Sequence, residues 1–337
     1  MHYGWFQWLD HFMGRNTAFA MTRGGRKRFY EKAYEKMMAG PKGRVLEVDR
    51  RKEISVTEFR KKYLYPGRPL IFEGAANEWA CVKNWSLDFM KEQHGDDQIV
   101  LVDQEDVQND YETLTLGELI DGIRDGLSRY YRFYPLLQRH PERLLDFDLK
   151  WLRQHRHQRV IFDTFQVFIG PHDSYTPLHN ANAGNLFTQV YGEKHWMLYP
   201  NHYMPVMDPN PVMSNYRTAP IRKDYGPFNP FEPEYEHPYH LFEYIDSYSA
   251  YLKPGDVLFN PSYYWHAVKN HGDTIGVGFR WLPLGYTFRK FPLYAFLDMC
   301  AMRPPFWKTW KLSQIDPNLT HLAEHGKLKE YLKQQEK

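Results

Sequence analysis

The sequence lacks the features that define several large classes of protein. Its only two cysteines, Cys81 and Cys300, are far apart and form no CxxC pair, so we expect no disulfide framework and a reducing, cytoplasmic setting. No apolar run approaches the roughly 20 residues that span a bilayer, and no GxGxxG, Walker or GxSxG motif is present. The formal net charge is only +2, so composition gives no reason to expect a nucleic-acid partner. We expect a soluble protein without a membrane span.

Short runs of strand-forming residues fill the second half of the chain. They cover residues 165–170, 186–190, 195–199, 248–252, 256–260 and 274–281. Turn signals separate them, such as Tyr191-Gly192-Glu193-Lys194 and Lys253-Pro254-Gly255-Asp256, which are typical of short connections between strands. This pattern predicts a mostly β protein built as a sandwich or small barrel. Helical patterns at residues 29–38, 116–127 and 141–151 lie in the first half.

Changes in composition suggest three regions. Residues 1–44 form a basic helical extension, in which the run from Arg23 to Arg28 is either a solvated helix face or a contact for an anionic partner. Residues 45–285 form the main domain, with its β core at about 160–285, and residues 286–337 form a helical tail. Residues 201–246 are rich in Pro, Tyr, Phe and Asn without periodicity, and a loop of this length predicts a lid or binding loop.

The segment Thr176-Pro177-Leu178-His179-Asn180-Ala181 is typical of the iron-binding strand of a non-haem oxygenase, except that one ligand is missing. In that chemistry a carboxylate follows the first histidine by two residues, and a second histidine, here His266, lies further along the chain. Residues two apart on a strand point to the same face. Ala181 therefore presents a methyl group beside His179, whereas Asn180 points away and cannot replace the carboxylate.

Several further segments occur in a characteristic order: Gly67–Gly74, Ile169–Pro171, Thr176–His179, Asn185–Val190, Gly192–Lys194, Leu252–Pro261 and Tyr264–His266. In this respect the chain from about Pro66 to Trp281 resembles the cupin-type JmjC family of iron(II)- and 2-oxoglutarate-dependent oxygenases. The resemblance implies a double-stranded β-helix of the cupin or jelly-roll type, with helical additions at both ends. It also implies metal and cosubstrate residues: His179 and His266 as iron ligands, Lys194 for the distal carboxylate of 2-oxoglutarate, and Thr176 and Asn185 lining the cosubstrate.

The missing carboxylate leaves three functions open. Chloride or bromide can occupy the place beside Ala181, as in non-haem iron halogenases, where Ala or Gly replaces the carboxylate. This alternative, which the sequence leads us to favour, predicts a radical halogenase that uses iron(II), 2-oxoglutarate and O₂ on an unactivated C–H bond. Water can fill the place instead, which predicts a hydroxylase with a two-histidine iron site. If metal affinity falls too far, the chain is a non-catalytic cupin-fold binding protein.

The substrate is expected to be a small molecule or a carrier-bound group. Arg280, on the last expected strand, is either an anion binder or an ordinary surface arginine. Arg217 and Tyr225, in the expected lid, are candidate contacts to an anionic substrate group. The sequence does not indicate an oligomeric state.

Overall fold

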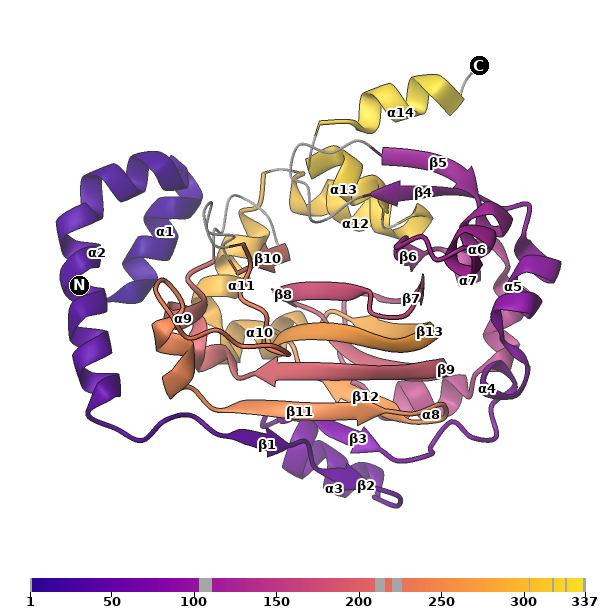
Figure 1. The fold of residues 1–337 in the computed structure, drawn as a ribbon, viewed down its shortest axis with the longest axis horizontal. Coiled ribbons are helices and arrows are strands. Elements are labelled where there is room, and N and C mark those ends of the chain that lie inside the picture. Colours follow the sequence, from indigo (N-terminus) through magenta and orange to yellow (C-terminus); the bar gives the residue numbers. More distant parts are fainter. Residues whose placement is uncertain are drawn as a thin grey trace.

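In the part of the chain that the structure describes, eleven strands form one strongly curved sheet at the centre (Figure 1). The computed structural model describes residues 2–102, 111–209, 216–219, 226–302, 304–316, 318–324 and 326–335. The strands are β1 (Val45–Glu47), β2 (Arg50–Arg51), β3 (Leu70–Phe72), β6 (Tyr131–Tyr134), β7 (Asp163–Gly170), β8 (Tyr175–Ala181), β9 (Gly184–Tyr199), β10 (Tyr216–Thr218), β11 (Ser247–Leu252), β12 (Val257–Asn260) and β13 (Trp265–Trp281). The cupin-type double-stranded β-helix is confirmed.

The strand order places β8 and β13 side by side. The main path is β10-β8-β13-β9-β12-β3-β2, with β11 on β9, β7 on β13, β6 on β7 and β1 on β11. A separate two-stranded sheet contains β4 (Gln98–Val102) and β5 (Tyr111–Thr115). Phe187, Trp196, Leu198, Leu252 and Leu258 belong to one buried apolar cluster formed by these strands. Much of the aromatic content is therefore core.

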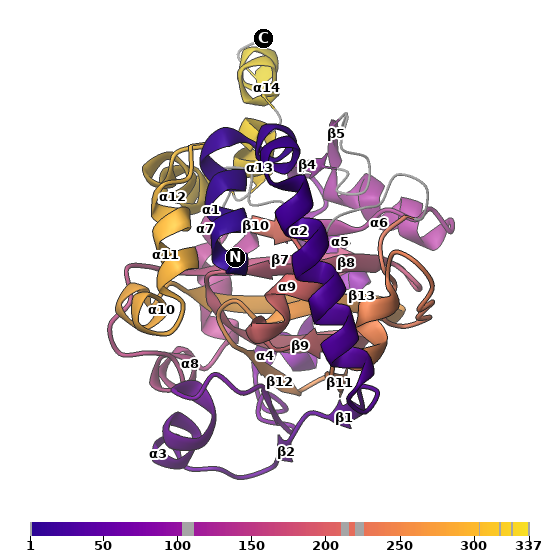
Figure 2. The ribbon, with the colours of Figure 1, turned by 90° about the vertical axis from the view of Figure 1, so that its left-hand side faces the viewer.

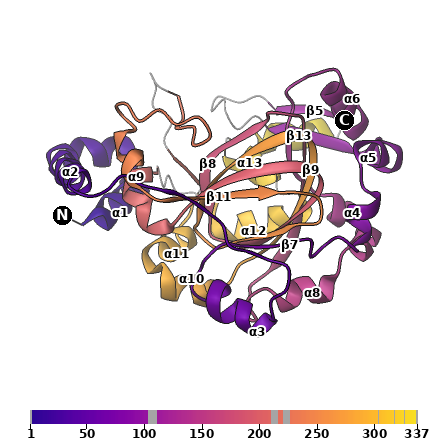
Figure 3. The same ribbon diagram turned by 60° about the horizontal axis from the view of Figure 1, so that its bottom comes forward.

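Helices make a larger share of the chain than a mostly β composition suggests. They are α1 (Tyr3–Met13), α2 (Arg15–Met38), α3 (Val56–Phe59), α4 (Ala80–Asn84), α5 (Leu87–His94), α6 (Leu116–Arg124), α7 (Leu136–Arg139), α8 (Leu149–Gln154), α9 (Met204–Met207), α10 (Leu284–Lys290), α11 (Pro292–Met299), α12 (Phe306–Ile315), α13 (Asn318–Glu324) and α14 (Leu328–Gln335). The pair α1–α2 lies at one end of the sheet and α4–α6 at the other (Figures 1 and 3). None of the described helices is long and apolar enough to cross a bilayer.

Helix starts follow side-chain caps that the sequence contains. Ser86 accepts a hydrogen bond from the Phe89 amide at 3.1 Å and begins α5, a position at which serine is favoured. Thr115 and Glu118 form a reciprocal capping box that begins α6. The helical pattern at residues 141–151 divides into a 3₁₀ turn, Pro141–Asp146, and α8.

The expected turn at Tyr191-Gly192-Glu193-Lys194 is instead the bent middle of one long strand, β9. Gly192 has a φ of +65°, a conformation that glycine adopts at little cost, and a side chain there would collide with the Asp273 carbonyl. The register between β9 and β13 shifts at the same level. One half of β9 pairs with β12 and the other with β11, so a bulge replaces the hairpin.

Part of the expected lid is a strand. Within residues 201–246 the structure describes a 3₁₀ turn (Asn201–Tyr203), α9, β10 and a second 3₁₀ turn (His240–Tyr244). β10 pairs antiparallel with β8, with Thr218 opposite His179 and Tyr216 opposite Ala181. This segment therefore extends the sheet beside the strand that carries the first histidine.

Candidate functional site

His179 and His266 meet across two neighbouring strands. They are register partners on β8 and β13, and their ring centroids are 4.1 Å apart. The Nδ1 atom of His179 lies 2.8 Å from the Pro177 carbonyl oxygen, and that of His266 lies 3.0 Å from the Tyr264 carbonyl oxygen. A carbonyl oxygen only accepts, so the hydrogen of each neutral ring sits on Nδ1 and the lone pair on Nε2. Both rings thus have the tautomer that suits metal binding through Nε2.

Burial keeps both rings uncharged. It lowers the pKa of His266 to about 4 and that of His179 well below the usual value, with the charge of His266 adding to the effect on His179. Trp196 stacks on the His266 ring at a centroid distance of 5.3 Å and an interplanar angle of 22°. At neutral pH the pair is therefore two oriented, neutral imidazoles, the form in which histidine binds metals.

Ala181 lines the same cavity as the two histidines, which has a volume of about 40 Å³. Asn180 points to the other side of β8, where it is 0% exposed and neither side-chain polar atom has a hydrogen-bond partner among the described residues. Those residues include no group of three His, Cys, Asp or Glu side chains able to hold a metal. No described carboxylate takes the place that Ala181 leaves.

Thr176 faces the cavity because β8 bulges at Pro177. His266 pairs with His179 and Val268 pairs with Thr176. Between these two pairs β8 moves on by three residues and β13 by only two, so β8 contains one extra residue. Proline has no amide hydrogen to give to a sheet, so it occurs at bulges and edges. The extra residue brings Thr176 to the same face as His179, and both line the cavity.

Lys194 is inside the protein, one layer behind the cavity wall. It is 0% exposed, and its ammonium group donates to Asn270 Oδ1 (2.5 Å), Thr274 Oγ1 (2.9 Å) and the Tyr130 hydroxyl (3.3 Å). These partners are neutral, and burial lowers the Lys194 pKa well below its usual value, with the nearby Arg132 charge lowering it further. Tyr130, one of these partners, is itself part of the cavity lining.

Asn185, Asn260 and Arg280 also line the cavity. Asn260 and Arg280 are the partners of Asn185 on β12 and β13. The Oδ1 atoms of Asn185 and Asn260 are buried and have no hydrogen-bond partner among the described residues. Arg280 donates to Gln166 Oε1 at 2.9 Å, and its charge contributes to the lowered pKa of both histidines. Arg280 is thus a cavity residue rather than an ordinary surface arginine.

Arg217 does not line the cavity, which corrects the expectation that it contacts substrate. It is 0% exposed and forms an ion pair with Asp298 of α11 at 2.5 Å. Asp298 also accepts from the Tyr263 hydroxyl at 2.5 Å. Arg217 therefore attaches β10 to α11. The other expected lid contact, Tyr225, lies outside the described residues.

Sequence reasoning missed Tyr130 and Arg132, which line the cavity at and beside β6. Arg132 donates to Thr176 Oγ1 at 3.2 Å and lies 4.5 Å above the Tyr130 ring. The aromatic and basic run from Arg129 to Tyr134 is the signal that marks them. The four residues of β6 are all buried, so the strand shows no alternation of buried and exposed residues that would indicate which of them face the cavity.

The fold and the paired histidines define a cupin-type barrel with a candidate metal-binding pocket. Residues 56–284 match the model of the cupin-like domain, and the chain belongs to this family.

Three curated relatives illustrate the likeness. The chain is 24% identical over 238 residues to lysine-specific demethylase 8 of Xenopus tropicalis, covering 67% of this chain and 51% of the relative. It is 25% identical over 260 residues to the 2-oxoglutarate and iron-dependent oxygenase JMJD4 of Danio rerio (68% and 59%). It is 24% identical over 280 residues to JmjC domain-containing protein F of Dictyostelium discoideum (66% and 58%). The matches span little more than half the length of these relatives.

Proposed function

We propose that the chain is an iron(II)- and 2-oxoglutarate-dependent oxygenase that hydroxylates an unactivated C–H bond at a two-histidine metal site. The observation that carries this proposal is the pair His179 and His266, whose neutral rings lie 4.1 Å apart on adjacent strands. The sequence alone favours halogenation because of Ala181. The relatives named above, an oxygenase and a demethylase among them, move the preference to hydroxylation.

The residues present fit such a metal. Neutral imidazoles are suitable ligands for iron(II), and two of them leave positions for a cosubstrate and oxygen. When bound, iron(II) with 2-oxoglutarate and O₂ would supply the oxidising power to break a C–H bond. The backbone carbonyls of Pro177 and Tyr264 hold the two rings in one tautomer, and such outer contacts orient the ligands of a metal.

Lys194 is the proposed contact for the distal carboxylate of 2-oxoglutarate. A buried ammonium group with only neutral partners costs free energy, and a dicarboxylate would offset that cost. Thr176 and Asn185, both in the cavity wall, would line the cosubstrate. Phe168 and Phe187, which also line the cavity, would limit the access of water. The proposed substrate is a small molecule or a carrier-bound group.

Halogenation is the second candidate, and Ala181 is the observation that favours it. Its methyl group lines the cavity, and no described carboxylate reaches the histidines. A chloride or bromide ion beside Ala181 would replace the missing negative charge, and the charge of Arg280, which acts on both rings, would favour an anion there.

The test is anaerobic addition of iron(II) and 2-oxoglutarate, followed by visible absorption of the resulting metal-to-ligand charge-transfer band. We expect a band in the wild type and in His172→Ala, a control at an exposed histidine, and no band in His179→Ala. A band that is unaffected by chloride, together with a hydroxylated product, supports hydroxylation. A band that shifts with chloride, together with a halogenated product, supports halogenation. Absence of any band in the wild type would leave a non-catalytic binding protein.

A further inference from the structure

Exposed apolar side chains concentrate in two segments of the chain. Of the 22 large apolar side chains that are exposed in the described part of the chain, 13 lie in residues 2–28 and 288–315. These two segments together are about a sixth of the sequence. Single exposed apolar residues are ordinary, but a contiguous group marks an interaction surface.

The two segments come together because α1 and α11 run side by side in parallel. A side chain on Gly4 would lie 3.1 Å from Leu293, and His11 Nε2 lies 3.3 Å from the Cys300 carbonyl oxygen. In both contacts the two residues are 289 positions apart in the sequence. A constant separation means that the two helices run in the same direction, and the contacts cover the full length of α11. Figure 2 shows the two helices together on one side of the molecule.

The outer sides of these helices carry a continuous aromatic surface. Trp5, Trp8 and Phe12 recur at helical spacing on α1, with ring centroids 6.0 and 4.8 Å apart along the series, and Trp5 is 59% exposed. Phe296 and Met299, three apart on α11, are also exposed. Because residues three or four apart share one side of a helix, each of the two adjacent helices presents one exposed row, and we call these five side chains together the aromatic face.

The charge of this region has one sign. Residues 2–28 and 288–315 contain ten Lys or Arg and two Asp, a net charge of +8, whereas the whole chain is +2 and the remainder therefore −6. The two acids, Asp10 and Asp298, are buried. Seven of the cations are exposed: Arg23, Lys27, Arg28, Arg289, Lys290, Lys308 and Lys311. The described residues of these two segments thus display no exposed carboxylate, although Lys27 pairs at 3.7 Å with the exposed Glu31 on the next turn of α2.

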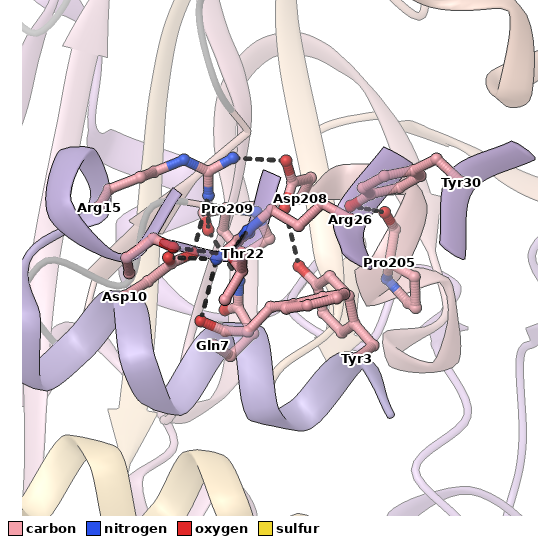
Figure 4. Close-up of polar contacts among 12 residues, drawn as sticks. Tyr3, Gln7, Asp10, Arg15, Thr22, Arg26, Tyr30, Pro205, Asp208 and Pro209 are labelled. Carbon is pink, nitrogen blue, oxygen red and sulfur yellow. Dashed lines mark hydrogen bonds and ion pairs between the residues drawn. The ribbon is translucent and has the colours of Figure 1, made fainter. Parts of the chain in front are cut away.

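Buried ion pairs fix the N-terminal hairpin, α1 and α2, to the body (Figure 4). Arg26 pairs with Asp10 between the two helices, and Arg15 pairs with Asp208 after α9. The Tyr3 hydroxyl donates to Asp208 at 3.2 Å. The aromatic face is therefore held in place before any partner arrives.

We propose that the aromatic face and the exposed cations of the same two segments bind the surface of an anionic lipid bilayer. Tryptophan and phenylalanine favour the boundary between headgroups and acyl chains, and Lys and Arg around them attract anionic lipid. A second copy of the chain is a poor match because two regions rich in exposed cations would face each other. Nucleic acid would match the charge, but the exposed methionine of this face, Met299, offers no ring on which a base could stack.

Sedimentation of the full-length protein with vesicles tests the proposal. We compare phosphatidylcholine vesicles with vesicles in which about a third of the lipid is phosphatidylglycerol. We expect binding to the anionic vesicles that is about tenfold or more stronger than to phosphatidylcholine alone and that weakens as salt is added.

Matched variants separate the apolar and the charged contributions. Trp5→Ser/Trp8→Ser should weaken binding about tenfold or more, whereas Leu145→Ser/Ile161→Ser, which alters exposed apolar residues elsewhere, should not. Arg23→Glu/Arg28→Glu should remove the preference for anionic vesicles. Lys52→Glu/Lys61→Glu, with the same charge change at other exposed positions, should keep it.

Three results would overturn the proposal. The first is no binding to anionic vesicles. The second is equal binding to both kinds of vesicle. The third is a dimer in light scattering that Trp5→Ser/Trp8→Ser dissociates, since a second copy would then cover the face. Thermal unfolding of each variant verifies that the exposed substitutions leave the fold intact.

Discussion

Replacing Lys194 with methionine should remove cosubstrate binding without lowering stability. The lysine is 0% exposed, its hydrogen-bond partners among the described residues are neutral, and burial lowers its pKa, whereas methionine has a similar length without a titratable group. The variant avoids the cost of burying an ammonium group, about several kcal/mol, and loses hydrogen bonds worth about 1–3 kcal/mol to acceptors such as Asn270. We expect the variant without ligand to be as stable as the wild type or about 1–3 kcal/mol more stable.

The effect on cosubstrate binding has the opposite sign. Loss of one partner of a buried charged pair costs about 2–5 kcal/mol, which weakens 2-oxoglutarate binding about 30-fold or more. At 100 times the wild-type Kd the ligand adds about 2.7 kcal/mol of stability. With an unfolding entropy of about 0.7 kcal/mol/K for a chain of this size, that is a rise in Tm of about 4 °C. For a variant that binds 2-oxoglutarate 100-fold more weakly, the same ligand concentration should raise Tm by only about 0.6 °C.

The assay is thermal unfolding under anaerobic conditions with iron(II), with and without 2-oxoglutarate. Lys253→Met, at an exposed lysine, is the control and should keep the full rise in Tm. A rise in Tm of normal size in Lys194→Met would refute the cosubstrate role of Lys194. A large loss of stability in ligand-free Lys194→Met would refute the argument that burying the lysine lowers the free energy of unfolding.

The same lysine gives a pH dependence with a defined sign. Burial lowers the Lys194 pKa in the folded protein, so between that value and the unfolded pKa of about 10.4 the folded state binds fewer protons than the unfolded state. Stability therefore rises with pH in this window. The stability advantage of Lys194→Met over the wild type should shrink as pH rises from 7 towards about 10.4, as denaturant titrations at several pH values would show.

Three further predictions concern the site and its supports. Ala181→Asp should bind iron(II) about tenfold or more tightly in anaerobic titration and lose any sensitivity to chloride, because it supplies the missing ligand; unchanged affinity would contradict the position assigned to Ala181. Asp298→Ala should lower stability by about 3–5 kcal/mol, whereas Arg217→Met/Asp298→Leu should cost about 1 kcal/mol or less, since only the first leaves a buried charge alone; equal losses in urea titrations would count against a buried ion pair. Arg26→Met should destabilise by about 1.5–3 kcal/mol, because Asp10 then keeps only its contact with Arg15 at 3.3 Å, and the exposed Lys27→Met by no more than about 0.5 kcal/mol, with limited proteolysis of the hairpin following the same order.

The barrel and its histidine pair were accessible from the sequence because strand spacing and ordered segments are local signals. Strand alternation is enough to place His179 and Ala181 on one face. It fails for Thr176, which reaches the cavity only through the bulge at Pro177. The turn-forming residues around Gly192 likewise predict a hairpin, whereas in the structure that glycine bends a continuous strand. Bulges add one residue without a change in composition, so periodicity does not reveal them.

Contacts between distant segments are what the sequence does not reveal. An arginine in an expected lid, such as Arg217, suggests a contact to an anionic substrate. Its actual partner is Asp298, which lies 81 positions further along the chain. Tyr130 and Arg132 reach the cavity through β6, whose pairing with β7 is irregular. The exposed aromatic side chains of α1 and α11 are nearly 300 positions apart in the sequence, and only the packing of the two helices shows that they belong to one region.

The pairing of β10 with β8 has a mechanical consequence. Lifting residues 216–218 away breaks the ladder opposite His179 and Ala181 and also separates Arg217 from Asp298. The strand that carries His179 is an inner strand only while this segment is seated, and without it the strand becomes a sheet edge. We therefore expect any opening of β10 also to loosen the strand that carries His179.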